Sequence, residues 1–192
     1  MAVRAPRQAG APRARLLSAA LELFARNGVS GTSLQMIADE LGVTKAAVYH
    51  LFHSKEEIVL AVVSPALERL AGVADFAESR SGRRNRQEAV LAGLIDLIVE
   101  NRRLAAVLYS DHSVADVVRN HAALGVLSNR INRLLTGPDP DTETRIGAAM
   151  VTGGLAIVGV DPMIGDIDDE AFRQHLLTTA RRILRLRNPA QP

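Results

Sequence analysis

Apolar side chains recur at helical spacing along most of this sequence, whereas the alternation that marks β-strands is scarce. In residues 13–27, Leu17, Ala20, Leu21 and Phe24 fall at i, i+3, i+4 and i+7, and Gly28 follows where a helix would end. Similar patterns predict helices over residues 32–41, 45–51, 55–77, 88–98, 104–109, 114–135, 144–160 and 169–184. We therefore expect an all-α fold of about nine helices.

The second and third predicted helices are short and have distinct end signals. Thr32 and Gln35 have the spacing of a capping box, which satisfies two backbone N–H groups at a helix start. Gly42 can adopt the left-handed conformation that ends the second helix, and Thr44 is a good N-cap for the third. Two capped helices joined by a glycine-containing turn predict a helix-turn-helix, which places one helix in the major groove of DNA.

The third predicted helix, residues 45–51, has an inner and an outer face. Ala47, Val48 and Leu51 could pack inward. The outer face and the N-terminal end carry hydroxyl, ammonium, phenol and imidazole groups, which suit phosphates and base edges. With the flanking helix starts included, the predicted DNA contacts are Thr32, Ser33, Gln35, Thr44, Lys45, Ala46, Tyr49, His50 and Lys55. The alternative is a solvated amphipathic helix pair that contacts nothing.

This segment resembles the DNA-binding signature of the TetR family of transcriptional regulators. The matching residues are Thr32, Ile37, Ala38, Gly42, Val43, Thr44, Lys45, Tyr49, His50, Phe52, Ser54, Lys55 and Ile58. The resemblance implies a three-helix DNA-binding domain, a long fourth helix and a helical C-terminal domain for ligand binding and dimerisation. One departure is Leu51, where an aromatic residue or histidine is common, and it should alter packing or a phosphate contact but not the fold.

The distribution of charge and the absence of cysteine narrow the functional classes. Residues 1–55 hold seven Lys and Arg against three acidic residues, a net charge of +4, whereas residues 56–192 have a net charge of −2. A basic module at one end is typical of a DNA reader joined to another function. Without cysteine, disulfides, thiolate metal sites and thiol nucleophiles are excluded. No catalytic motif is present, so we expect neither an enzyme nor a cofactor.

The pattern divides the chain into three parts. Residues 1–12 form a predicted disordered basic tail, which either contacts DNA or is solvated. Residues 13–56 form the predicted DNA-binding domain, and residues 57–188 the predicted ligand-binding and dimerisation domain. The fourth helix follows the N-cap Ser54 and contains Pro65, which should kink or split it, as a hinge or as a bend without function. Residues 78–87 form a predicted loop.

The C-terminal domain is predicted to bind a small-molecule effector in an apolar pocket with few polar groups. Candidate pocket residues are Asn101, Tyr109, His112, His121, Met150 and Thr152. We expect no metal site, because His112 and Asp116 at i, i+4 fall short of the three or four convergent ligands that a site needs.

Two apolar helices near the end of the chain need a partner surface. The helix over residues 144–160 is apolar nearly all round, so we predict that it is buried on most sides, and its glycines would allow another helix to approach closely. In proteins of the TetR family the last two helices pair with those of a second subunit. The resemblance thus implies dimer contacts by Gly147, Gly154, Phe172, Leu176 and Ile183.

The favoured function is a cytoplasmic, ligand-responsive regulator: a repressor that binds a palindromic double-stranded DNA operator as a homodimer and is released by a small molecule. No membrane association is expected, because the apolar run over residues 146–160 is too short to cross a bilayer. Two alternatives stay open. One is an all-helical small-molecule carrier or enzyme with a vestigial helix-turn-helix, and the other is a module that binds another protein through its last two helices.

Overall fold

The computed structural model describes residues 11–102, 105 and 122–186, and all regular structure in this part of the chain is helical. The elements are α1 (Ala11–Asn27), α2 (Leu34–Leu41), α3 (Lys45–Leu51), α4 (Lys55–Ser79), α5 (Arg83–Glu100), α8 (Ala122–Thr136), α9 (Thr142–Val158), the 3-10 turn η1 (Pro162–Ile164) and α10 (Asp169–Ile183). The prediction of an all-α fold is confirmed. None of these helices is long and apolar enough to cross a membrane.

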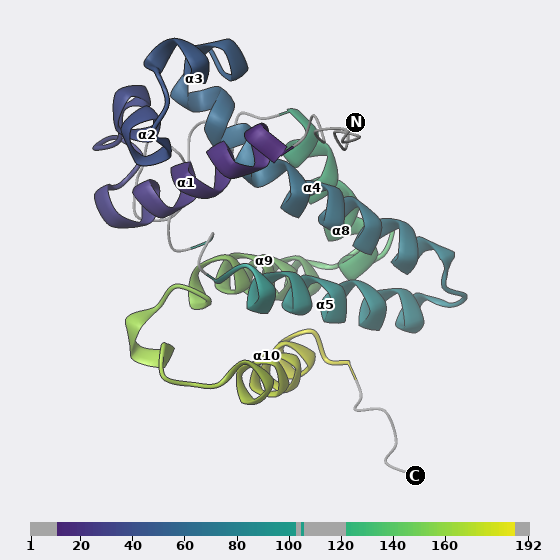
Figure 1. Ribbon diagram of the computed structural model, residues 1–192. Helices are drawn as coiled ribbons and strands as arrows, with labels where there is room; N and C mark the ends of the chain where they lie inside the picture. Colours follow the sequence, from purple (N-terminus) through teal and green to yellow (C-terminus); the bar gives the residue numbers. More distant parts are fainter. Residues whose placement is uncertain (1–10, 103–104, 106–121, 187–192) are drawn as a thin grey trace, which may run out of the picture.

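The helices gather into two groups that share α4 (Figure 1). Helices α1, α2 and α3 lie together at one end, whereas α5, α9 and α10 lie side by side at the other. Two separate clusters of buried apolar residues match these groups, one reaching from Leu16 to Val63 and the other from Ala74 to Ala180. The first half of α4 contributes to the first core and the second half to the second core.

The first core confirms helix formation in α1 and corrects the face that the helix buries. Leu16, Ala20, Leu23 and Phe24 are buried, whereas Leu17 and Leu21 of the predicted stripe are only partly buried. The helix also begins at Ala11, so residues 11 and 12 are helical rather than part of a disordered tail. Residues 1–10 of that tail lie outside the described residues.

Helix α4 is continuous from Lys55 to Ser79, so Pro65 does not split it. The Ser64 hydroxyl donates to Glu68 Oε1 at 3.1 Å and does not cap a new helix. Because proline lacks an N–H group, the carbonyl of Ala61 loses its intrahelical partner at this turn. A hinge function for Pro65 stays a prediction.

The predicted loop over residues 78–87 is wrong, because only residues 80–82 separate α4 from α5. Gly82, with φ +84°, provides the turn, and the following residues begin α5. Arg83 Nη2 donates to the carbonyl of Thr136 at 2.6 Å, and Gln87 Nε2, largely buried, donates to that of Leu135 at 2.6 Å. These bonds fasten the start of α5 to the end of α8.

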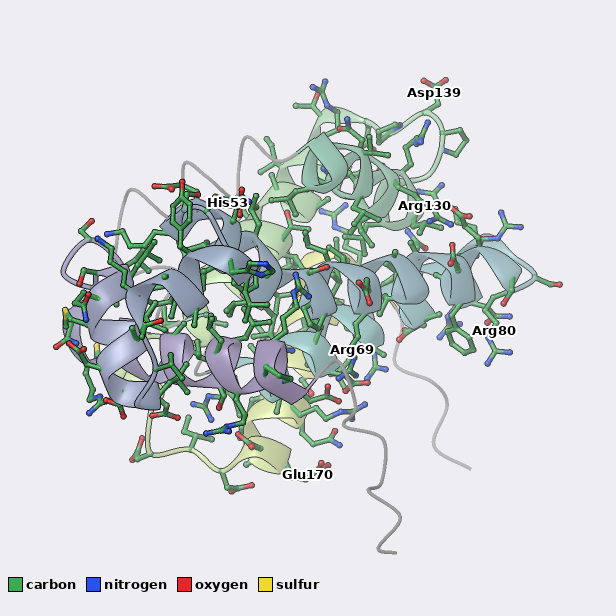
Figure 2. All side chains as sticks on the ribbon, turned by 45° about the horizontal axis from the view of Figure 1, so that its top comes forward. His53, Arg69, Arg80, Arg130, Asp139 and Glu170 are labelled. Atoms are coloured by element: carbon green, nitrogen blue, oxygen red, sulfur yellow. The ribbon has the colours of Figure 1, made fainter. Side chains whose placement is uncertain are left out.

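Ion pairs brace the second group of helices. Arg130 of α8 reaches α4, where Nη2 lies 2.6 Å from Asp75 Oδ1 and Nε lies 2.6 Å from Glu78 Oε1. Figure 2 shows Arg130 on the side of α8 that faces α4. The hydrogen bonds from Arg130 hold the pKa of the Glu78 carboxyl below its ordinary value. Arg181 and Glu88 form a similar bridge between α10 and α5 at 2.9 Å.

The end of the chain follows the sequence prediction closely. Asp141 caps α9 by accepting from Thr144 N at 2.7 Å, and Asp168 caps α10 as predicted. The bond from the Thr144 amide lowers the pKa of Asp141. Apart from residue 105, the predicted helix over residues 104–109 lies outside the described residues, as does the first part of that over residues 114–135, and the described α8 begins at Ala122.

Candidate nucleic-acid interface

The helix-turn-helix is built by local capping. Ser33 Oγ accepts from the Met36 amide at 3.2 Å and starts α2. At the other end Gly42 lies in the left-handed region with φ +64°, and the Val43 amide donates to the carbonyl of Ala38 at 3.0 Å. Thr44 Oγ1 then accepts from the Ala47 amide at 3.2 Å, which confirms Thr44 as the N-cap of α3.

The capping box predicted for Thr32 and Gln35 is wrong. Thr32 is 2% exposed, and its hydroxyl donates to the carbonyl of Gly28 at 2.7 Å, so it locks the connection between α1 and α2. The Thr32 side chain is therefore not available to DNA. Gln35 is exposed and donates to Asp39 Oδ1 at 2.7 Å, one turn further along α2. The cap is Ser33, one residue later than predicted.

The outer face of α3 is exposed, as predicted. Lys45, Ala46, Tyr49 and His50 all face solvent, with Tyr49 52% exposed, and buried Val48 holds the opposite face against the core. Tyr49 also meets His53 edge to face at a centroid distance of 5.1 Å, which limits the orientations of the phenol ring. The face thus offers cationic, phenolic and imidazole groups around a small alanine.

The inner face of α3 is less buried than predicted. Ala47 is exposed and Leu51 is 40% exposed. Together with Val43 they line a shallow apolar cavity of about 170 Å³ between α1, α2 and α3. The departure from the TetR pattern at Leu51 therefore falls on a partly open wall and leaves the fold unchanged.

Lys55 has contacts within the chain that we did not predict. Its Nζ donates to the carbonyls of Val29 at 2.7 Å and Ser30 at 3.2 Å, so the ammonium group ties the start of α4 to the α1–α2 connection. Glu56 and Glu57 place two carboxylates at the same helix start. The pKa of Glu56 is lowered by hydrogen bonds from its own backbone N–H and from Ser54.

These two glutamates also change the charge of the module. The net charge of +4 was counted over residues 1–55, and the count over residues 1–57 is +2. In the described part, Arg26 is paired with Glu40 at 3.2 Å, and Arg13 lies over the ring of Phe52 at 5.0 Å. The excess of positive charge in this module rests on Arg4 and Arg7, which lie outside the described residues.

An apolar cavity of about 320 Å³ lies between α4, α5, α8 and α9, and we call it the inner cavity. Leucine and isoleucine form most of its wall, and its polar residues are Ser128, Asn132 and Thr152. Of the predicted pocket residues only Thr152 is found here. Asn101 instead donates to the carbonyl of Leu97 at 2.7 Å at the end of α5. The remaining predicted residues are Met150, which is 61% exposed on α9, and Tyr109, His112 and His121, which lie outside the described residues.

Sequence reasoning missed Ser128 and Asn132. Both fall on the turns of α8 that also carry Ile131, so the signal was present as polar residues beside an apolar stripe. The pattern could not distinguish a solvent face from a cavity wall. Among the described residues, no group of three His, Asp or Glu side chains could hold a metal ion.

Helix α9 is not buried on most sides within this chain, contrary to the prediction. Ile146, Met150 and Ile157 are each more than half exposed. Gly147 is packed inside the chain, because a Cβ atom there would lie 3.3 Å from the carbonyl oxygen of Ile183, whereas Gly153 and Gly154 have nothing within 4 Å.

Some of the predicted dimer residues are packed inside the chain, whereas others line its surface. Phe172 is 2% exposed under the guanidinium of Arg102, so the structure contradicts a role for it in a dimer contact. Gly154, Leu176 and Ile183 line a shallow apolar groove between α9 and α10. Met150, predicted as a pocket residue, lies in this groove as well.

Known proteins resemble this chain most clearly over the helix-turn-helix. Residues 16–62 match the sequence model of the family described as bacterial regulatory proteins, tetR family. SrpR, an HTH-type transcriptional regulator of Pseudomonas putida, is 36% identical over 98 residues, which make up 51% of this chain and 45% of SrpR. TtgW, an HTH-type transcriptional regulator from the same species, is 35% identical over 98 residues, 51% of this chain and 71% of TtgW. The chain belongs to the TetR family.

The TetR family consists of bacterial regulatory proteins, and the matched residues 16–62 contain the helix-turn-helix formed by α2 and α3. The match spans less than half of the length of SrpR. The fold extends further. The transcriptional regulator FadR from Bacillus subtilis, solved in complex with stearoyl-CoA, superposes with a TM-score of 0.66 at 18% identity, covering 91% of this chain and 96% of FadR.

Proposed function

We propose that this TetR-family protein is a ligand-responsive repressor that binds a palindromic operator as a homodimer and leaves it when a small molecule binds. The observation that carries the proposal is the exposed polar face of α3, capped at Thr44 and backed by buried Val48. On this face the proposed DNA contacts are Thr44, Lys45, Ala46, Tyr49 and His50, joined by Ser33 and Gln35 at the start of α2. Lys55 supports the interface by fastening the α1–α2 connection.

The homodimer is supported by the surface that α9 leaves uncovered. Ile146, Met150 and Ile157 expose apolar side chains, and Gly153 and Gly154 present open backbone beside them. Covering such a surface removes apolar area from water, and glycines let a second helix approach closely. A twofold axis would also place two α3 helices for two half-sites about 34–36 Å apart.

The effector is proposed to occupy the inner cavity. Its volume of about 320 Å³ and its apolar wall fit the usual description of a small-molecule site. FadR, which shares the fold, was solved with stearoyl-CoA, and an apolar chain of that kind would suit this wall. Leu70 of α4 lines the cavity, and Arg130 joins α8 to the same helix. A ligand in the cavity would therefore contact α4 directly and also through α8.

For ligand binding to release the DNA, the ligand must bind more tightly to the protein with α4 in one position than in another. A preference of about 1–3 kcal/mol is typical of such linkage and would change operator affinity by roughly 5–150-fold. Because the first half of α4 packs in the core of the DNA-binding module, its movement would change the distance between the two α3 helices. Occupation of promoter DNA by the dimer accounts for repression without any further contact.

Selection of genomic DNA fragments by the purified protein tests the proposal directly, at two salt concentrations. We expect enrichment of a short palindrome whose half-sites lie one helical turn apart, with binding that weakens as salt rises. The variant Tyr49→Ala should lose specific affinity and keep its thermal unfolding temperature, because Tyr49 is exposed. Equal enrichment of all DNA, or unchanged operator affinity in Tyr49→Ala, would contradict the proposed interface.

A further inference from the structure

A second, larger cavity lies on the outside of the C-terminal domain, between α8, α9 and the turn that joins them. We call it the outer groove, and its volume is about 780 Å³. Arg133 and Arg145 are the charged residues of its wall, and Asn129 and Asn132 add amide groups. No Asp or Glu is among its described lining residues. Figure 2 shows Asp139 at the outer end of the turn, where its side chain points away from the helices.

The two arginines of this groove differ from the six arginines of the described C-terminal part that form ion pairs with carboxylates. Elsewhere in the described C-terminal part, carboxylates neutralise the guanidinium groups of Arg69, Arg102, Arg130, Arg173, Arg181 and Arg185. Arg133 and Arg145 take part in no ion pair within the described residues, and both are exposed. The groove therefore presents two positive charges that the surrounding described residues leave without a carboxylate contact.

Glu78 is an acidic neighbour of Arg133 among the described residues, and its carboxylate already binds Arg130. Glu78 and Arg133 both line a smaller cavity next to the groove, and Arg133 helps to lower the pKa of Glu78. Both oxygens of that carboxylate accept from Arg130, at 2.6 Å each. The guanidinium of Arg133 thus keeps its own donors for another anion.

The outer groove and the inner cavity adjoin. Asn132 and Thr152 line both of them, one from α8 and one from α9. The Thr152 hydroxyl donates to the carbonyl of Ala148 at 2.9 Å, so its oxygen is left as an acceptor at the junction. An apolar space that shares two polar wall residues with a cationic groove matches a molecule with an apolar chain and a charged end.

We propose that the effector is an anionic amphiphile whose alkyl chain fills the inner cavity and whose carboxylate or phosphate head binds Arg133 and Arg145 in the outer groove. This inference rests on the proposed function, because it assigns a chemical class to the proposed effector. At roughly 30 Å³ for each water-sized group, 320 Å³ holds a chain of about ten non-hydrogen atoms. The two guanidinium groups would bind a negatively charged head group in preference to a neutral one.

Binding of three ten-carbon probes, decanoate, decyl phosphate and decan-1-ol, tests the inference by calorimetry with the full-length protein. We expect the two anions to bind roughly tenfold more tightly than the alcohol at low salt, with the difference shrinking as salt rises. The double variant Arg133→Gln, Arg145→Gln should bind all three alike. For a matched control, Arg182→Gln removes an exposed arginine of α10 outside the groove and should leave the preference intact.

The outcomes separate this inference from the proposed function. Preference for both anions that disappears in the double variant supports the inference, and the more tightly bound anion identifies the head group. Equal binding of decanoate and decan-1-ol by the wild-type protein overturns it while leaving an apolar effector in the inner cavity. Binding of none of the three probes also overturns it, and the DNA selection described above still decides whether the protein reads an operator. Circular dichroism of each variant checks that its helices are intact.

Discussion

Lys55 is a structural tie between two parts of the DNA-binding module, and replacing it by methionine should lower stability more than it changes phosphate contact. The ammonium donates to two carbonyls, at 2.7 and 3.2 Å, one of them on buried Val29. Hydrogen bonds from a charged donor contribute about 1.5–3 kcal/mol each, and partial exposure and the longer second bond place the sum near the low end. We expect a loss of about 2 kcal/mol, or about 4–8 °C in thermal unfolding temperature.

Lys45 supplies a matched control, because it is the only other lysine of the sequence and lies exposed on α3. If Lys45 binds a phosphate, Lys45→Met should reduce the slope of log K against log salt by about 0.9 per subunit and leave unfolding nearly unchanged. Lys55→Met should show the opposite pattern. The measurements are differential scanning calorimetry and operator titrations at several salt concentrations. A reduced salt slope with an unchanged unfolding temperature in Lys55→Met would refute our reading and restore Lys55 as a phosphate ligand.

Three further predictions concern other contacts. Thr32→Val removes the hydroxyl that donates to Gly28, and should cost about 1–2 kcal/mol in urea unfolding, whereas Thr32→Ser should cost less; equal losses would contradict the role of the hydrogen bond. Met150→Glu places a charge on the uncovered face of α9 and should convert a dimer to a monomer in analytical ultracentrifugation, and a persistent dimer would exclude this face. Glu78→Gln should be less stable than the wild type at pH 7. Because Arg130 lowers the folded pKa of Glu78, this contribution is present above the unfolded pKa and is lost as pH falls through the folded pKa. The difference should therefore shrink on acidification, and a pH-independent difference would contradict it.

The local signals of the sequence predicted the helix-turn-helix well, because capping and glycine turns are decided by nearby residues. Gly42, Thr44 and Asp168 hold the positions that their chemistry favours. The error at Thr32 shows the limit of such reasoning. Thr32 and Ser33 are both good caps, and only the packing of α1 against α2 buries the first and leaves the second to cap.

Long-range contacts account for the other errors. The start of α5 resembled a loop because it is rich in arginine and follows a serine and a glycine, yet Arg83 and Gln87 donate to acceptors about fifty residues away at the end of α8. We predicted Lys55 as a DNA contact and Phe172 as a dimer contact from their residue types. In the fold each has a partner within the chain: Lys55 donates to Val29, and Phe172 lies under Arg102. The spacing of apolar residues identifies the apolar face of a helix but not the element that packs against this face.

The sharing of α4 between two separate cores makes this chain suitable for building hybrid regulators. Leu67 packs against the first core and Leu70 against the second, so a junction between residues 67 and 70 cuts through neither. A chimera that exchanges everything after that junction for the same part of a relative would retain operator choice and acquire a new chemical input. The single continuous helix keeps the phase of the two halves fixed, provided that the exchange preserves the number of residues across the junction.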